Sequence, residues 1–244
     1  MIWHSHICSR ILAAAVSATL FAATLQAAAV RGTVELPGSR VGAVARGQDY
    51  SGAVLSLRAV IQPLAAAPEK HATMLQKDKM FAPHILPVVA GTAIDFPNAD
   101  PVFHNAFSSY SGQIFDVGLY PPGTSRTVRF QRPGIVRVFC NIHPSMSAII
   151  LVLTTPYFAV TPHDGSFGIE VPPGAYDLSV FHERATGQSL QALSRRILVT
   201  SEDVRIPPIV VSEAGYLMTP HKNKYGKDYD PHSDDMTFYP GTHK

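Results

Sequence analysis

Cysteine is scarce in this chain of 244 residues, which has only two. Cys8 lies in an N-terminal stretch that we expect to be removed, so Cys140 is the only cysteine of the mature chain and an internal disulfide is excluded. A single thiol that is exported into an oxidising compartment is prone to oxidation unless it is buried or bound to a metal. Two interpretations of Cys140 therefore stay open, a buried inert thiol and a metal ligand.

Long apolar runs and a strong net charge are also missing after the N-terminus. Residues 1–29 predict a cleavable signal peptide, because a short polar start precedes the apolar run 11–25 and small residues follow it. That run is shorter than the roughly 20 residues that cross a bilayer. We therefore expect a periplasmic protein without a membrane span in its mature form. The formal net charge of +2 gives no reason to expect a nucleic-acid partner.

Long helical patterns are absent as well. The 20 prolines and 17 glycines divide the chain into short segments, and no long amphipathic pattern is evident. The continuous apolar run 149–153 and the alternation over 128–130 and 136–138 are typical of strands. The sequence therefore predicts an all-β protein.

Four potential metal ligands lie in two short segments. Cys140, His143 and Met146 stand three residues apart, and His104 lies upstream. A thiolate, two imidazoles and a weak thioether form the ligand set of blue-copper electron-transfer centres, where sulfur favours Cu(I) and imidazole suits Cu(II). A lone methionine or histidine is usually a packing residue, but these four in this order predict one type 1 copper site.

These segments resemble the copper loops of the cupredoxins. The spacing Cys-x2-His-Pro-x-Met, which begins at Cys140, is similar to the amicyanin variant of the loop, whereas plastocyanin-like loops have additional residues before the methionine. The resemblance covers residues 71–153 and implies a Greek-key β-sandwich whose copper ion is held by the four ligands. It also implies that Asn105 ties the two ligand loops together by hydrogen bonds.

Residues 155–212 have the pattern of another β-sandwich, since two turns that contain glycine each lead into an expected strand. This segment resembles the prealbumin-like, carboxypeptidase regulatory-like fold. The opening strands of that fold correspond to residues 32–34 and 53–57, which precede the cupredoxin segment. We therefore expect residues 30–66 to complete this sandwich, with the cupredoxin inserted between its strands. Two consecutive domains with an N-terminal arm are the alternative.

The polar tail, residues 213–244, contains histidines and carboxylates at loose spacings that match no zinc or copper template. We expect it to be mostly disordered. The chain as a whole also resembles bacterial secreted proteins of the methylamine utilisation family. That broader resemblance is less specific about function.

No enzyme motif accompanies the copper ligands. A multicopper oxidase has histidines directly beside its copper cysteine, whereas Phe139 and Asn141 flank Cys140, and no serine-hydrolase or zinc-protease motif occurs. We therefore expect a protein that is not an enzyme and that carries single electrons between partners such as a c-type cytochrome or a periplasmic dehydrogenase. A copper chaperone or storage protein, which hands on the metal, is the alternative.

Two surfaces are candidates for the passage of the electron. The cupredoxin resemblance implies that His143 reaches the surface through an apolar patch near Pro101 and Phe103. Strand alternation places Arg137 and Phe139 on the outer face of their strand. A basic strand face there either steers an acidic partner or is only a solvated surface.

Overall fold

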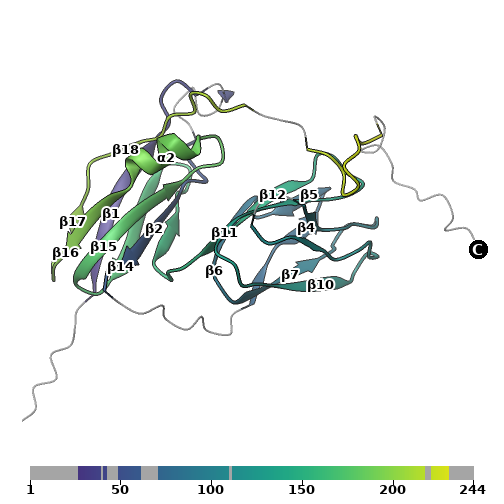
Figure 1. The fold of residues 1–244 in the computed structure, drawn as a ribbon, viewed down its shortest axis with the longest axis horizontal. Helices are drawn as coiled ribbons and strands as arrows, with labels where there is room; N and C mark the ends of the chain where they lie inside the picture. Colours follow the sequence, from purple (N-terminus) through teal and green to yellow (C-terminus); the bar gives the residue numbers. More distant parts are fainter. Residues whose placement is uncertain are drawn as a thin grey trace, which may run out of the picture.

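The computed structural model describes residues 27–39, 41–42, 49–61, 71–109, 112–217 and 221–230. Within these residues the chain is almost entirely β and forms two β-sandwiches, which confirms the all-β prediction (Figure 1). Residues 1–26 of the expected leader and residues 231–244 of the expected tail lie outside the described residues. No helix in the described ranges is long and apolar enough to cross a membrane.

The flanking sandwich is built from strands that lie on both sides of the cupredoxin segment in the sequence. One sheet contains β1 (Ala28–Glu35), β14 (Ser166–Val171), β17 (Val204–Arg205) and β18 (Ile209–Val210). The other contains β2 (Val54–Ala59), β13 (Phe158–Val160), β15 (Gly174–Phe181) and β16 (Arg195–Val199), with α2 (Gly187–Leu193) beside β15. Strand β1 pairs with β14, and β2 pairs with β15. These pairings join strands that precede the cupredoxin segment to strands that follow it, as an insertion requires.

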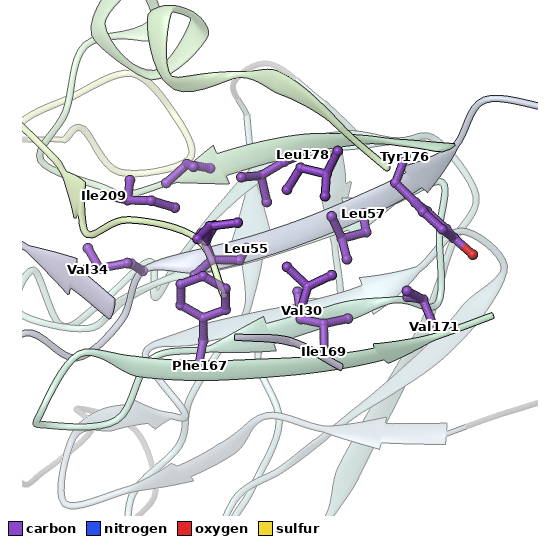
Figure 2. Packing of buried hydrophobic residues seen from close by; sticks show 14 of the residues in the cluster. Val30, Val34, Leu55, Leu57, Phe167, Ile169, Val171, Tyr176, Leu178 and Ile209 are labelled. Carbon is purple, nitrogen blue, oxygen red and sulfur yellow. The ribbon is translucent and has the colours of Figure 1, made fainter. Parts of the chain in front are cut away.

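The core of the flanking sandwich lies between its two sheets. Figure 2 shows Val30 of β1 on one side of this core and Leu57 of β2 on the other. Gly32 lies where β1 approaches the ring of Phe167, and a Cβ atom there would be 2.9 Å from the ring. This close approach explains why the first residue of the segment 32–34 in β1 is a glycine.

Strand β1 begins inside the leader that the sequence predicts to end at residue 29. Ala28 and Ala29 are buried, and the N–H of Ala29 donates to the Asp203 carboxylate at 2.9 Å. Cleavage after Ala29 would remove two residues that pair with β14. The pairing of β1 with β14 therefore begins two residues before the predicted end of the leader.

The inserted sandwich, residues 71–153, contains the predicted ligands. One of its sheets has β3 (His71–Thr73), β7 (Thr92–Pro97) and β10 (Ser125–Phe130). The other has β6 (Ile85–Val89), β8 (Phe107–Ser108), β9 (Phe115–Asp116), β11 (Gly134–Phe139) and β12 (Ser147–Leu153). A separate hairpin joins β4 (Leu75–Lys77) to β5 (Met80–Ala82). Strand β12 pairs with β11 on one side and with β6 on the other, which places the ends of β11 and β12 next to each other.

Strand β11 leads directly into the ligand loop. Its side chains alternate, so that Val138 is buried in the core and Arg137 is exposed, as the sequence predicts. Phe139 lies on the outer face but is not open to solvent, because Phe107 and His221 pack on its ring. Of these two residues, only Arg137 is exposed to solvent on the outer face.

A polar contact joins the two sandwiches. His84, just before β6, has its Nε2 atom 2.7 Å from the Glu183 carboxylate and its Nδ1 atom 3.1 Å from the Ser147 carbonyl. Because both ring nitrogens face acceptors, the ring favours its protonated form. The hydrogen bond to Glu183 raises the pKa of His84, and the same hydrogen bond lowers the pKa of Glu183.

We predict that this contact stabilises the chain most at mildly acidic pH. The raised pKa of His84 gives stability that is present below the ordinary value of 6.5 and is lost as the pH rises through the raised pKa. The lowered pKa of Glu183 gives stability that is present above the ordinary value of 4.5 and is lost on acidification. The melting temperature of the unaltered chain should therefore exceed that of His84→Gln most between pH 4.5 and 6.5. A difference that persists unchanged at alkaline pH would contradict this.

The strand order predicts that residues 155–244 do not fold alone. Strand β1 lies between β14 and β17, and β2 lies between β13 and β15, so the fragment would lose an internal strand from each sheet. We expect the fragment to show no cooperative thermal transition by circular dichroism, in contrast to the full chain. A cooperative melt of the fragment would show that the early strands are dispensable.

Candidate metal centre

The predicted ligands lie in two loops of the inserted sandwich. Cys140, His143 and Met146 belong to the loop between β11 and β12, and His104 lies between β7 and β8. The N–H of Cys140 donates to the Met146 carbonyl at 3.2 Å, and the N–H of Met146 donates to the His143 carbonyl at 3.1 Å. The ligand loop is therefore closed on itself. His104 is fixed by two backbone hydrogen bonds with Tyr120.

Three of the four predicted ligands converge in the interior. The Nδ1 atoms of His104 and His143 are 3.1 Å apart, and the Sγ atom of Cys140 lies 3.9 and 3.6 Å from them respectively. All three side chains are buried, and their ligand atoms lie within 4.8 Å of one another. Two imidazole nitrogens and one sulfur form a donor set that suits copper, so the residues present fit this metal.

Met146 completes the predicted set by its position. Its side chain is fully buried and belongs to the same hydrophobic cluster as Cys140. Backbone hydrogen bonds within the ligand loop join Met146 to Cys140 and to His143. Its role as the weak axial ligand stays a prediction.

Asp100, which no sequence motif indicates as part of the site, holds the ring of His104. The carboxylate accepts a hydrogen bond from the Nε2 atom of His104 at 2.7 Å and from the backbone N–H groups of Asp78 and Lys79 at 2.6 and 2.9 Å. Burial acts to raise the pKa of Asp100, but the hydrogen bonds from Lys79, His104 and Asp78 outweigh it and lower the pKa. Asp100 is therefore a carboxylate that faces His104.

This contact selects which nitrogen of His104 is available to a metal. Burial lowers the pKa of His104, so the ring is neutral, and its single proton lies on Nε2, where it is donated to Asp100. The lone pair of Nδ1 is left facing Cys140 and His143. A carboxylate that fixes a ligand histidine in this way sets its tautomer and orientation.

The surroundings of Cys140 act on its thiol in two directions. Burial raises the pKa of the thiol, and the backbone N–H groups of Ile142, Asn105, His143 and Asn141 point at the sulfur and offset part of this effect. The thiol is thus protonated at neutral pH, while donors to a thiolate are already in place. Metal binding to such a site releases the proton.

Asn105 connects the two ligand loops through its backbone. Its N–H donates to the sulfur of Cys140, whereas its side-chain Nδ2 donates to Asp116 at 2.7 Å and to the Gly118 carbonyl at 3.1 Å. The cupredoxin resemblance implies that Asn105 links the two loops by hydrogen bonds. In the structure the link is made by its backbone N–H group. The side chain instead fixes the segment after β9.

His143 is buried, with only 1% of its surface exposed. The sequence predicts that this ring reaches the surface near Pro101, and that expectation is wrong for the described chain. Next to His143 in the sequence, the carbonyl of Pro144 lies 2.9 Å from the Nε2 atom of His221. A segment of the tail covers this side of the ligand loop.

Residues 221–230 of the tail are ordered against the ligand loop, in contrast to the disorder that their composition predicts. The hydroxyl of Tyr229 donates to the Cys140 carbonyl at 2.8 Å, and the N–H of Lys224 donates to the Asn141 side chain at 3.0 Å. These contacts connect residues about 80 to 90 positions apart in the chain. No local pattern in the sequence signals them.

Comparisons with known proteins identify similar folds only. No family model matches the chain, and no curated protein sequence matches it. Among solved structures, a purple cupredoxin from Nitrosopumilus maritimus is 21% identical, covering 34% of this chain and 99% of its own, with a TM-score of 0.32. Amicyanin from Paracoccus versutus is 16% identical, covering 40% of this chain and 98% of its own, with a TM-score of 0.33.

This chain also has a likeness to part of a larger protein. A copper-containing nitrite reductase from Thermus scotoductus is 24% identical, with a TM-score of 0.34, and the match covers 39% of this chain but only 25% of the reductase. At these TM-scores the likenesses carry no inference about what this chain does. The assignment of the site rests on the positions of its own donor atoms.

The contact between Asp100 and His104 predicts that Asp100→Asn weakens copper binding. An amide of nearly the same size loses the charge that holds the Nε2 proton, so the ring is free to change tautomer. Loss of such a partner costs about 10- to 100-fold in metal affinity. A competition titration with a copper chelator measures this. Asp177→Asn, which removes a carboxylate that pairs with arginines in the flanking sandwich, is the control and should leave the affinity unchanged.

Proposed function

We propose that this chain is a periplasmic type 1 copper protein that carries single electrons. The observation that supports this most strongly is the buried convergence of one cysteine sulfur and two histidine Nδ1 atoms. His104, Cys140 and His143 would hold one copper ion, with Met146 as the weak fourth ligand. The ion would supply the one-electron couple between Cu(II) and Cu(I).

The residues around the donors favour a rigid site. Asp100 fixes the ring of His104, and the hydrogen bonds of the closed ligand loop restrict Cys140 and Met146. Burial excludes water from the donor atoms. Because both oxidation states would meet the same preformed ligands, the change of state needs little rearrangement, which is a property that an electron carrier requires.

Enclosure of the site supports the carrier over the copper chaperone or storage protein. A chaperone must present its ligands to a recipient, whereas the four residues proposed here are all buried. The donor loop also contains no histidine directly beside Cys140, so the chain lacks the connection that leads to a trinuclear copper cluster. We therefore propose a carrier and not an enzyme.

The proposed partners are a c-type cytochrome or a periplasmic dehydrogenase. Arg137 is exposed on β11 near the ligand loop and would contribute positive charge to the approach of an acidic partner. We propose a docking or scaffold role for the flanking sandwich. Its resemblance to the carboxypeptidase regulatory-like fold, and that of the whole chain to the methylamine utilisation family, stay predictions.

The ligand set predicts an intense visible absorption band for the chain loaded with one equivalent of Cu(II), which disappears on reduction. Cys140→Ser should abolish the band because the band depends on the thiolate. Met146→Leu should keep the band and raise the reduction potential, because loss of an axial donor destabilises the more highly charged Cu(II) more than Cu(I). Absorption spectroscopy and protein-film voltammetry measure the two effects.

Met74→Leu is the matched control for Met146→Leu, since Met74 is also fully buried in the inserted sandwich. It should change neither the band nor the potential. A colourless Cu(II) complex of the unaltered chain would refute the type 1 assignment. Equal potentials for the two methionine variants would refute Met146 as a ligand.

A further inference from the structure

The covering segment, residues 221–230, is a compact turn with its own internal hydrogen bonds. The Asn223 side chain accepts from the N–H groups of Tyr225 and Lys227 at 3.0 and 3.1 Å, and the N–H of Asn223 donates to the Lys227 carbonyl at 2.9 Å. This turn brings the two ends of the segment together. The hydroxyl of Tyr229 lies 3.2 Å from the Nδ1 atom of His221.

The two ends of the covering segment contact main-chain carbonyls on either side of the ligand His143. Tyr229 donates its hydroxyl proton to the carbonyl of Cys140 at 2.8 Å. The Nε2 atom of His221 lies 2.9 Å from the carbonyl of Pro144. Both carbonyls belong to the short stretch of backbone that carries two of the proposed copper ligands.

Ring packing adds apolar burial to these polar contacts. The ring of His221 stacks on Phe139 at a centroid distance of 4.0 Å, and the ring of Tyr229 meets His221 edge-on at 5.2 Å. Phe139 directly precedes Cys140 in the chain. The stack therefore fixes the residue from which the ligand loop begins.

The middle of the covering segment reaches the second ligand loop indirectly. The Nζ atom of Lys224 lies 2.8 Å from the Asp116 carboxylate, which also accepts from the side chain of Asn105. The hydrogen bond that Lys224 donates to the Asp116 carboxylate raises the pKa of Lys224, so this amine is charged. Asn105 follows His104 in the chain. The covering segment is thus connected to both loops that supply ligands.

We infer that Tyr229 and His221 are positioning residues of the metal centre, which hold the ligand loop in place and limit the exchange of copper. Copper leaves the buried site when the loop opens, and the loop opens when the contacts to the Cys140 and Pro144 carbonyls break. The inference about copper exchange rests on the proposed function. The positioning of the loop is a property of the metal-free chain as well.

The test compares Tyr229→Phe with Tyr225→Phe in the full chain. Both variants lose one hydroxyl from the same segment, but Tyr225 is 70% exposed and its side chain contacts Lys224 within the segment, whereas the hydroxyl of Tyr229 is bonded to the ligand loop. Loss of one ordinary hydrogen bond should raise the rate of copper release to a chelator about fivefold in Tyr229→Phe. Tyr225→Phe should release copper at the rate of the unaltered chain.

A second measurement needs no copper. Amide hydrogen exchange of residues 140–146 in the metal-free chain should be faster in Tyr229→Phe than in Tyr225→Phe, while exchange in the flanking sandwich is equal in both. His221→Phe keeps a ring on Phe139 but loses the contact with the Pro144 carbonyl, and it should also speed exchange in the ligand loop.

The outcomes separate this inference from the proposed function. Equal copper release and equal amide exchange for the two tyrosine variants would overturn the positioning role. If the unaltered chain binds no copper, the proposed function fails. In that case amide exchange alone decides the positioning role, and faster exchange in Tyr229→Phe supports it.

Discussion

The hydrogen bond between His104 and Asp100 is the interaction on which the metal centre depends. It is buried, and it leaves the Nδ1 lone pair of His104 facing the sulfur of Cys140 and the ring of His143. Burying a polar ring is costly unless its nitrogens have partners. Asp100 satisfies one nitrogen, and a metal ion is a suitable partner for the other. The backbone of the β4–β5 hairpin in turn holds Asp100 through Asp78 and Lys79.

The scaffold brings distant parts of the chain to this site. Strands β7, β11 and β12 supply the ends from which the two ligand loops leave, and the tail returns to cover one of them. The strands of the flanking sandwich come from segments that precede and follow the inserted sandwich in the sequence. The flanking sandwich therefore forms only after these two segments have met. His84 and Glu183 then connect the two sandwiches at their junction.

Local sequence patterns predict the fold class and the donors because both depend on residues that lie close together in the chain. The alternation in β11 and the spacing of Cys140, His143 and Met146 are local features. The orientation of Asp100 is not, since it depends on the path of a loop and on Lys79 and Asp78 of a hairpin, which lie 21 and 22 residues away. The contacts that cover the ligand loop are not local either, since they come from a tail whose composition alone is typical of disorder.

X-ray absorption at the copper edge, measured on the chain loaded with one equivalent of copper, tests the central claim most directly. We expect one short copper–sulfur distance and two imidazole nitrogens, with little change in these ligands between the oxidised and reduced samples. A copper ion bound only by nitrogen and oxygen would contradict it, because Cys140 would then not be a ligand.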